Sequence, residues 1–145
     1  MVIPVSPVFI RACERSAAER TIGLRFSRDP LNAVTIRRVE RGRLLIGEET
    51  YEATVGLTAD RVISDALPSS LGAMSIETLA PLLDARPEML VVGSGWSAAL
   101  PPRELTFELA KRGLGMEVMD TPAACRTFNI LIGEGRRPAA LLFMD

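Results

Sequence analysis

The chain has 145 residues, of which 48% are hydrophobic and 24% are charged, and its formal net charge is −1. This balance is typical of one globular domain and excludes a disordered chain or two domains of ordinary size. The near-neutral charge gives no electrostatic reason to expect nucleic acid or an anionic membrane as a partner, and the absence of histidine excludes Ser-His-Asp triads, Cys-His pairs and HExxH metal sites.

Residues 1–33 are expected to form an N-terminal arm, and residues 34–145 a single α/β domain. The opening MVIPVSPVFIRACER is apolar, but two prolines interrupt it before it reaches membrane-spanning length, so no integral membrane segment is expected. A cleaved signal is the alternative for this stretch. Cys13 and Cys125 lie far apart without CxxC spacing, which indicates neither a zinc site nor a disulfide framework and favours the cytoplasm.

The start of the domain predicts a meander of short antiparallel strands. Residues 34–39 alternate roughly as a strand does, and Glu40-Arg41-Gly42 is typical of a turn before a return strand at 43–46. Gly47 then turns the chain into a further strand at 50–57.

The second half of the domain alternates helices and strands. A helix is expected from Ser75, a candidate N-cap, because apolar residues then recur at helical spacing. Residues 89–92 are a continuous apolar run, as in a strand covered on both faces. The remaining expected elements are a helix at 101–112, a strand at 114–119, a helix from 120 to Gly133 or Gly135, and a strand at 138–144.

This order of elements predicts an α/β fold, in which an antiparallel β-meander precedes a βαβαβ unit and helices pack on a mixed sheet. The strands at 89–92 and 115–119 are expected to pair in parallel through a right-handed crossover.

The stretch VVGSGWSAAL contains a glycine motif directly after a predicted strand. Gly93, Gly95 and Ala98 satisfy G-x-G-x-x-A, and an acidic residue follows at about the distance of the ribose-binding acid of a dinucleotide fold. However, residues 96–100 and two prolines separate the glycines from the next helix, whose N–H groups would face a phosphate. The motif therefore has two readings: a nucleotide site, or a loop whose glycines allow close approach of backbone.

The stretch MDTPAACRTFNIL is typical of a helix start. Asp120 or Thr121 can cap the helix and Pro122 suits its first position, while two small alanines leave the first-turn amides accessible to an anion. The carboxyl ends of parallel strands meet at one sheet edge, so this helix start and the Gly93 loop are expected together. The candidate pocket consists of Gly93, Ser94, Gly95, Trp96, Asp120, Thr121 and Asn129.

Cys125 lies close enough to this helix start for the helix dipole to lower its pKa, which is one route to a reactive thiol. Its spacing to Phe128 and Ile132 instead predicts packing against the sheet, and no histidine is present to act as its base. Asn129 has the alternatives of a structural bond to neighbouring backbone and a catalytic role. Trp96 is either an exposed anchor for a partner or folded over the core.

The strand ending in GSG, followed by GLGMEVMDTPAACRTFNIL and EGRRPAALL, resembles the family of mitochondrial NADH dehydrogenase (complex I) assembly factor 3. That family includes bacterial and archaeal relatives and adipogenesis-associated domain proteins. The resemblance covers roughly residues 34–144 and is most specific from Leu90 to Leu131, where Glu117–Asn129 is close to a signature. It implies a small three-layer α/β fold with a central mixed sheet. For the mitochondrial members, it implies a non-catalytic role as assembly partners of the respiratory NADH dehydrogenase. It implies no catalytic residue.

These observations lead to the hypothesis of a non-catalytic binding or assembly module, linked to the biogenesis of a respiratory complex. The alternative is a protein that binds a small molecule, nucleotide or anion with the Gly93 loop and the helix start at Asp120–Ala124. An enzyme is not expected, and neither a cofactor nor a metal. A protein partner is expected, and self-association is left open.

Overall fold

The computed structural model describes residues 33–145, so the N-terminal arm expected at 1–33 lies outside the described residues apart from Ala33. The elements follow in the order β1 (Ile36–Glu40), β2 (Arg43–Ile46), β3 (Glu49–Tyr51), β4 (Val55–Leu57), β5 (Val62–Ile63), the 3-10 helix η1 (Leu71–Ala73), α2 (Ala80–Leu83), β6 (Met89–Gly93), α3 (Arg103–Lys111), β7 (Gly115–Met119), α4 (Thr121–Gly133) and β8 (Pro138–Leu142).

A five-stranded mixed sheet, in the order β5-β4-β8-β6-β7, forms the centre of the molecule. Strand β6 pairs in parallel with both β7 and β8, so that Val91 lies opposite Glu117 on one side and Ala140 on the other. This confirms the predicted parallel pairing, and it places the last strand inside the sheet. Strand β8 also pairs antiparallel with β4, which makes the sheet mixed.

Each face of this sheet covers its own part of the core. Leu90 and Val92 pack with residues of α2 and α3, whereas Val91, between them in sequence, packs with residues of α4. The alternation arises because successive side chains of a strand point to opposite faces. The predicted three-layer architecture is thereby confirmed, with helices on both faces of the sheet.

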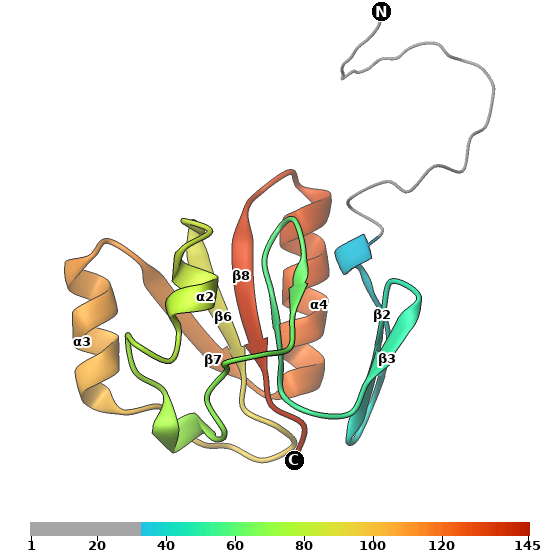
Figure 1. Ribbon diagram of the computed structural model, residues 1–145, viewed down its shortest axis with the longest axis horizontal. Helices are drawn as coiled ribbons and strands as arrows, with labels where there is room; N and C mark the ends of the chain where they lie inside the picture. Colours follow the sequence, from blue (N-terminus) through green and yellow to red (C-terminus); the bar gives the residue numbers. More distant parts are fainter. Residues whose placement is uncertain (1–32) are drawn as a thin grey trace, which may run out of the picture.

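A second, three-stranded antiparallel sheet, β1-β2-β3, lies on the far side of α4 from the five-stranded sheet (Figure 1). Leu44 and Ile46 are fully or almost fully buried and join the same core cluster as α4. Arg38 and Arg43 point outward from the other face. Helix α4 is therefore packed on two sides by sheets.

The strand expected at residues 50–57 is split between the two sheets. Its first part belongs to β3, and its last part is β4, which pairs with β8. The division follows burial: all three residues of β4 are buried, whereas the residues of β3 are exposed or half-buried. A uniformly buried segment fits the central sheet, which is covered on both faces.

The helix expected from Ser75 begins later, at Ala80. The Ser75 Oγ does accept a hydrogen bond from the Thr78 N–H at 3.2 Å, as a cap would, but residues 76–79 form turns. Pro81 has no N–H to donate to the carbonyl of Glu77. A regular helix that began near Ser75 would need this bond, so the regular helix begins only at Ala80. The remaining helices agree closely with expectation, and Gly113 ends α3 with φ of 78°.

Among the helices of residues 33–145, none combines the length and the apolar character needed to cross a bilayer.

Candidate functional site

The Gly93 loop and the start of α4 meet at the carboxyl edge of the five-stranded sheet, as the sequence predicts. The Thr121 N–H donates to the Gly95 carbonyl at 2.8 Å, and the Ser94 N–H donates to the Met119 carbonyl at 2.8 Å. We call this region the Gly95 junction and define it by Gly93, Gly95, Thr121, Phe143 and Asp145.

Thr121 is the central polar residue of the Gly95 junction. Its side chain is fully buried, and its hydroxyl donates to the Phe143 carbonyl at 2.6 Å while it accepts from the Gly95 N–H at 2.9 Å. With its own N–H bonded to Gly95, this residue joins the end of β8, the end of β6 and the start of α4. A buried hydroxyl that both donates and accepts is fully satisfied and holds these three segments in fixed positions.

The end of β8 packs directly against the two glycines. The Phe143 N–H donates to the Gly93 carbonyl at 2.9 Å, and the Trp96 N–H donates to the Asp145 carbonyl at 2.9 Å. A Cβ atom at Gly93 would lie 2.7 Å from Thr121 Oγ1, and one at Gly95, where φ is 93°, would overlap the Asp145 carbonyl. Of the two readings of the glycine motif, this geometry supports close approach of backbone, because protein atoms fill the space beside both glycines.

The first turn of α4 offers no free amide to an anion. The Thr121 N–H is bonded to Gly95, Pro122 has no N–H, the Ala123 N–H donates to Asp120 Oδ1 at 2.8 Å, and the Ala124 N–H donates to the Asp120 carbonyl at 2.9 Å. Asp120 is thus the N-cap, one of the two capping residues that the sequence offers. An anion at this end would have to displace one of these bonds, so the geometry disfavours the nucleotide and anion alternative.

Asn129 lies away from the Gly95 junction, on the side of α4 that faces the three-stranded sheet. Its Oδ1 accepts from the Ile36 N–H at 3.0 Å, and its Nδ2 donates to the Ile36 carbonyl at 2.8 Å. One side-chain amide therefore satisfies both backbone groups of the first residue of β1. The structure shows the structural bond that was one of the two alternatives for this residue.

Cys125 faces the core beside Phe128, as its helical spacing predicts, and is 1% exposed. Burial raises the pKa of the thiol from 9.0 to about 12, because the thiolate would lose its hydration, and the positive charge of Arg126 only partly opposes this effect. A thiol with this pKa is protonated at neutral pH and is a poor nucleophile. Within residues 33–145, no cluster of three or more metal-binding side chains occurs.

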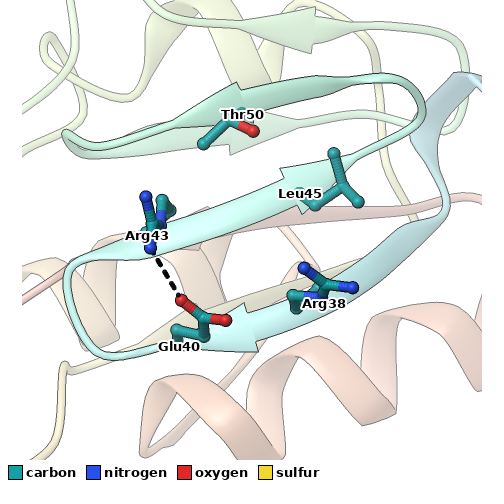
Figure 2. Close-up of a pocket in the computed structure, with 5 residues that line it drawn as sticks. All are labelled: Arg38, Glu40, Arg43, Leu45 and Thr50. Atoms are coloured by element: carbon teal, nitrogen blue, oxygen red, sulfur yellow. Dashed lines mark hydrogen bonds and ion pairs between the residues drawn. The ribbon is translucent and has the colours of Figure 1, made fainter.

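Among the described residues, surface hollows lie elsewhere that were not anticipated from the sequence, and two of them have a notable lining. One, of about 210 Å³, is on the outer face of the three-stranded sheet and is lined by Arg38, Glu40, Arg43, Leu45 and Thr50 (Figure 2). In it Arg43 Nη2 lies 3.1 Å from Glu40 Oε1. The second, of about 340 Å³, lies between the segment Met74–Glu77 and α3. The sequence offered one signal for the second hollow: Glu104 and Glu108 are four residues apart, so they lie on the same face of α3.

The fold is that of an α/β protein of the Mth938-like kind. A solution structure of a Mth938-like domain protein from Bordetella pertussis superposes with a TM-score of 0.66 at 25% identity, covering 84% of this chain and 93% of that one. The model of the protein family of unknown function DUF498/DUF598 matches residues 36–143. The chain belongs to this family.

Two sequence relatives have informative names. The NADH dehydrogenase [ubiquinone] 1 alpha subcomplex assembly factor 3 of Danio rerio is 45% identical over 71 residues, which are 48% of this chain and 41% of that protein. A 13 kDa major membrane protein of Francisella tularensis is 26% identical over 75% of this chain and 89% of its own length. The resemblance to assembly factor 3 is confirmed, although the chain spans less than half of the zebrafish protein.

Proposed function

We propose that this chain is a non-catalytic binding module that assists the assembly of a multisubunit complex, with the respiratory NADH dehydrogenase as the first candidate. The observation that carries the proposal is the likeness to a protein named as an assembly factor of NADH dehydrogenase, at 45% identity over 71 residues. Likeness to such a factor favours a role in holding another protein.

The geometry supports this proposal at the residues that the sequence singled out. Thr121 and the glycines of the Gly95 junction are occupied by bonds within the chain, and Asn129 joins two elements. Meanwhile Leu100, Phe107 and Ile130 are 85%, 61% and 59% exposed. Exposed aromatic and aliphatic side chains of this kind serve as anchors where a partner covers them.

We propose a cytoplasmic location, which is supported by the free thiol of Cys125 and by a cysteine spacing that does not indicate a disulfide framework. The Francisella relative is named a membrane protein, which makes association with a membrane-bound complex compatible with the proposal.

Affinity purification tests the proposal directly. The full chain, tagged and expressed in its native host, is expected to enrich one or more subunits of the respiratory NADH dehydrogenase over a tag-only control, as measured by quantitative mass spectrometry. When one of those subunits is tagged and used as the bait instead, it is expected to enrich this chain. If reciprocal purifications return no specific protein, the proposal is wrong.

A further inference from the structure

The hollow beside α3, which we call the acidic groove, has an apolar floor and an acidic rim. It lies between the segment Met74–Glu77 and α3, which run beside one another (Figure 1), and encloses about 340 Å³. This volume is at the lower end of the range found for ligand-sized sites, which begins at about 300 Å³.

The floor belongs to the core. Met74 and Leu105 are only 3% and 4% exposed and pack with the strands of the central sheet, while Ile76 is half-buried at the side of the groove. These side chains are fixed by the packing behind them, so the groove is formed before any partner arrives. A large apolar side chain that entered the groove would leave water and contact aliphatic side chains that are already fixed in place.

The rim carries three exposed carboxylates. Glu104 and Glu108 lie one turn apart on α3, and Glu77 faces them from the opposite side of the groove. Within residues 33–145, only Glu108 of the three has an ion-pair partner, Lys111 at 3.8 Å. The lining holds these three carboxylates against one cationic side chain, Arg112, so it has an excess of negative charge, which Lys111 beside Glu108 reduces in part.

An exposed aromatic residue lies next to Glu104, outside the groove lining. Phe107 lies three residues after Glu104 on α3, which places it on the adjoining helical face, and it is 61% exposed. From Glu104 to Arg112 the groove follows α3 for about 12 Å, at about 1.5 Å per residue. A surface of this length, with an apolar anchor at its side, suits a protein segment better than a small cation.

We propose that the acidic groove binds a basic segment of a partner protein, which places a large apolar side chain on Met74 and Leu105 and lysine or arginine side chains against Glu77, Glu104 and Glu108. The choice of occupant follows from charge complementarity, since the excess negative charge of the rim attracts cations and repels acidic segments. This proposal rests on the proposed function, because it names the surface at which that partner docks.

The test is an NMR titration of the full ¹⁵N-labelled chain with a short synthetic peptide that has a leucine flanked by lysines. Amide shifts are expected to concentrate at Ile76, Leu105 and Glu108, and binding is expected to weaken as salt is added, because exposed ion pairs are screened. A matched peptide with glutamate in place of lysine is expected to cause no such shifts.

A triple variant, E77Q/E104Q/E108Q, removes the charge of the rim and leaves its shape, and it is expected to weaken peptide binding about tenfold, the sum of three modest exposed pairs. The control is Glu117→Gln, an exposed carboxylate on β7 outside the groove lining, which is expected to keep the affinity. Retained spectra of the triple variant would show that it is folded.

Three results would overturn the proposal: shifts that fall outside the groove, equal binding of the glutamate peptide, or no shift at about millimolar peptide. Groove amides that shift on dilution without peptide would show that a second copy of the chain is the occupant, and would also overturn it. The two proposals fail separately. If the affinity-purified partner is retained by the triple variant, the groove is excluded while the binding function stands, and an empty purification leaves the peptide result unaffected.

Discussion

Glycine is required at position 95 because of its backbone conformation and the protein atoms packed against it. Its φ of 93° lies in the left-handed region, and the carbonyl of Asp145 occupies the place that a Cβ atom would take. Its N–H and carbonyl both bond to Thr121. A side chain at this position therefore disrupts the joining of β6, β8 and α4.

Substitution of Gly95 by alanine is expected to destabilise the protein by about 3 kcal/mol or more, through backbone strain and displacement of the chain end. Gly133→Ala is the matched control, because a Cβ atom there meets no neighbour within 4 Å and lies in the last turn of α4. The control is expected to be neutral or to stabilise by up to about 1 kcal/mol. Urea unfolding measures both, and equal stabilities of the two variants would contradict the role assigned to Gly95.

The raised pKa of Cys125 predicts a loss of stability at alkaline pH. The folded chain keeps the thiol proton up to about pH 12, whereas the unfolded chain loses it above the ordinary value of 9.0, so folding binds a proton in this window. The stabilisation is complete below about pH 9 and decreases as pH rises toward 12, by at most about 1.4 kcal/mol per pH unit.

Unfolding in urea from neutral pH to about pH 10.5 measures this slope. Cys125→Ala is expected to be less stable at neutral pH because it leaves a small cavity, but its stability should decrease less steeply above pH 9 than that of the wild type. Only the difference in slope is diagnostic, since other groups titrate equally in both proteins. Parallel slopes would show that the thiol is not buried in this way.

Helix α4 connects the two sheets of the molecule. Its N-terminus is fixed by Thr121 at the Gly95 junction, its apolar side packs on β6 and β8, and Asn129 bonds both backbone groups of Ile36. The three-stranded sheet is thus attached to the rest of the molecule by core packing and by this side-chain amide.

Removing the amide of Asn129 is expected to loosen the three-stranded sheet selectively. Asn129→Ala leaves the N–H and carbonyl of Ile36 without the amide, at a cost of about 1–3 kcal/mol. Hydrogen exchange is expected to accelerate in β1 and β2 and to stay slow in β6 and β8. Arg126→Ala, an exposed position of the same helix, is the control and should remain within about 0.5 kcal/mol of the wild type. Uniform acceleration across both sheets would contradict this connection.

The elements were predictable from sequence where one physical signal dominated. The apolar run at β6 and the proline and glycine that frame α3 and α4 each match one element of the structure. The split of residues 50–57 was not predictable, because the burial of Val55–Leu57 depends on the distant strand β8. The delayed start of α2 was readable in principle, since Pro81 lacks the N–H that an earlier start requires.

The Gly93 loop and the helix start at Asp120–Thr121 lie together in the structure, whereas Asn129, which was predicted with them, bonds to Ile36 elsewhere. The purpose of these residues was not readable from their spacing. A G-x-G motif looks the same whether the glycines face a phosphate or a chain end, and only the position of Phe143–Asp145 distinguishes the two. The acidic groove escaped prediction because it combines α3 with a segment nearly thirty residues earlier.

At the scale of the whole molecule, a well-packed core carries a surface with exposed apolar side chains and one acidic groove. Two core clusters fill both faces of the central sheet, and the conspicuous polar residues hold its parts together. The surface carries the exposed Leu100, Phe107 and Ile130 and the acidic groove. This arrangement fits the proposed role, in which the protein acts by binding a partner protein.

The most direct measurement is the amount of assembled respiratory NADH dehydrogenase, quantified on native gels, in the organism that carries the gene. Deletion of the gene is expected to lower the amount of assembled enzyme, and the wild-type chain and the Cys125→Ala variant are both expected to restore it, because the Cys125 thiol is buried and its pKa is raised to about 12. An unchanged amount of assembled enzyme after deletion would contradict the proposed assembly role, and failure of a folded Cys125→Ala variant would contradict its non-catalytic character.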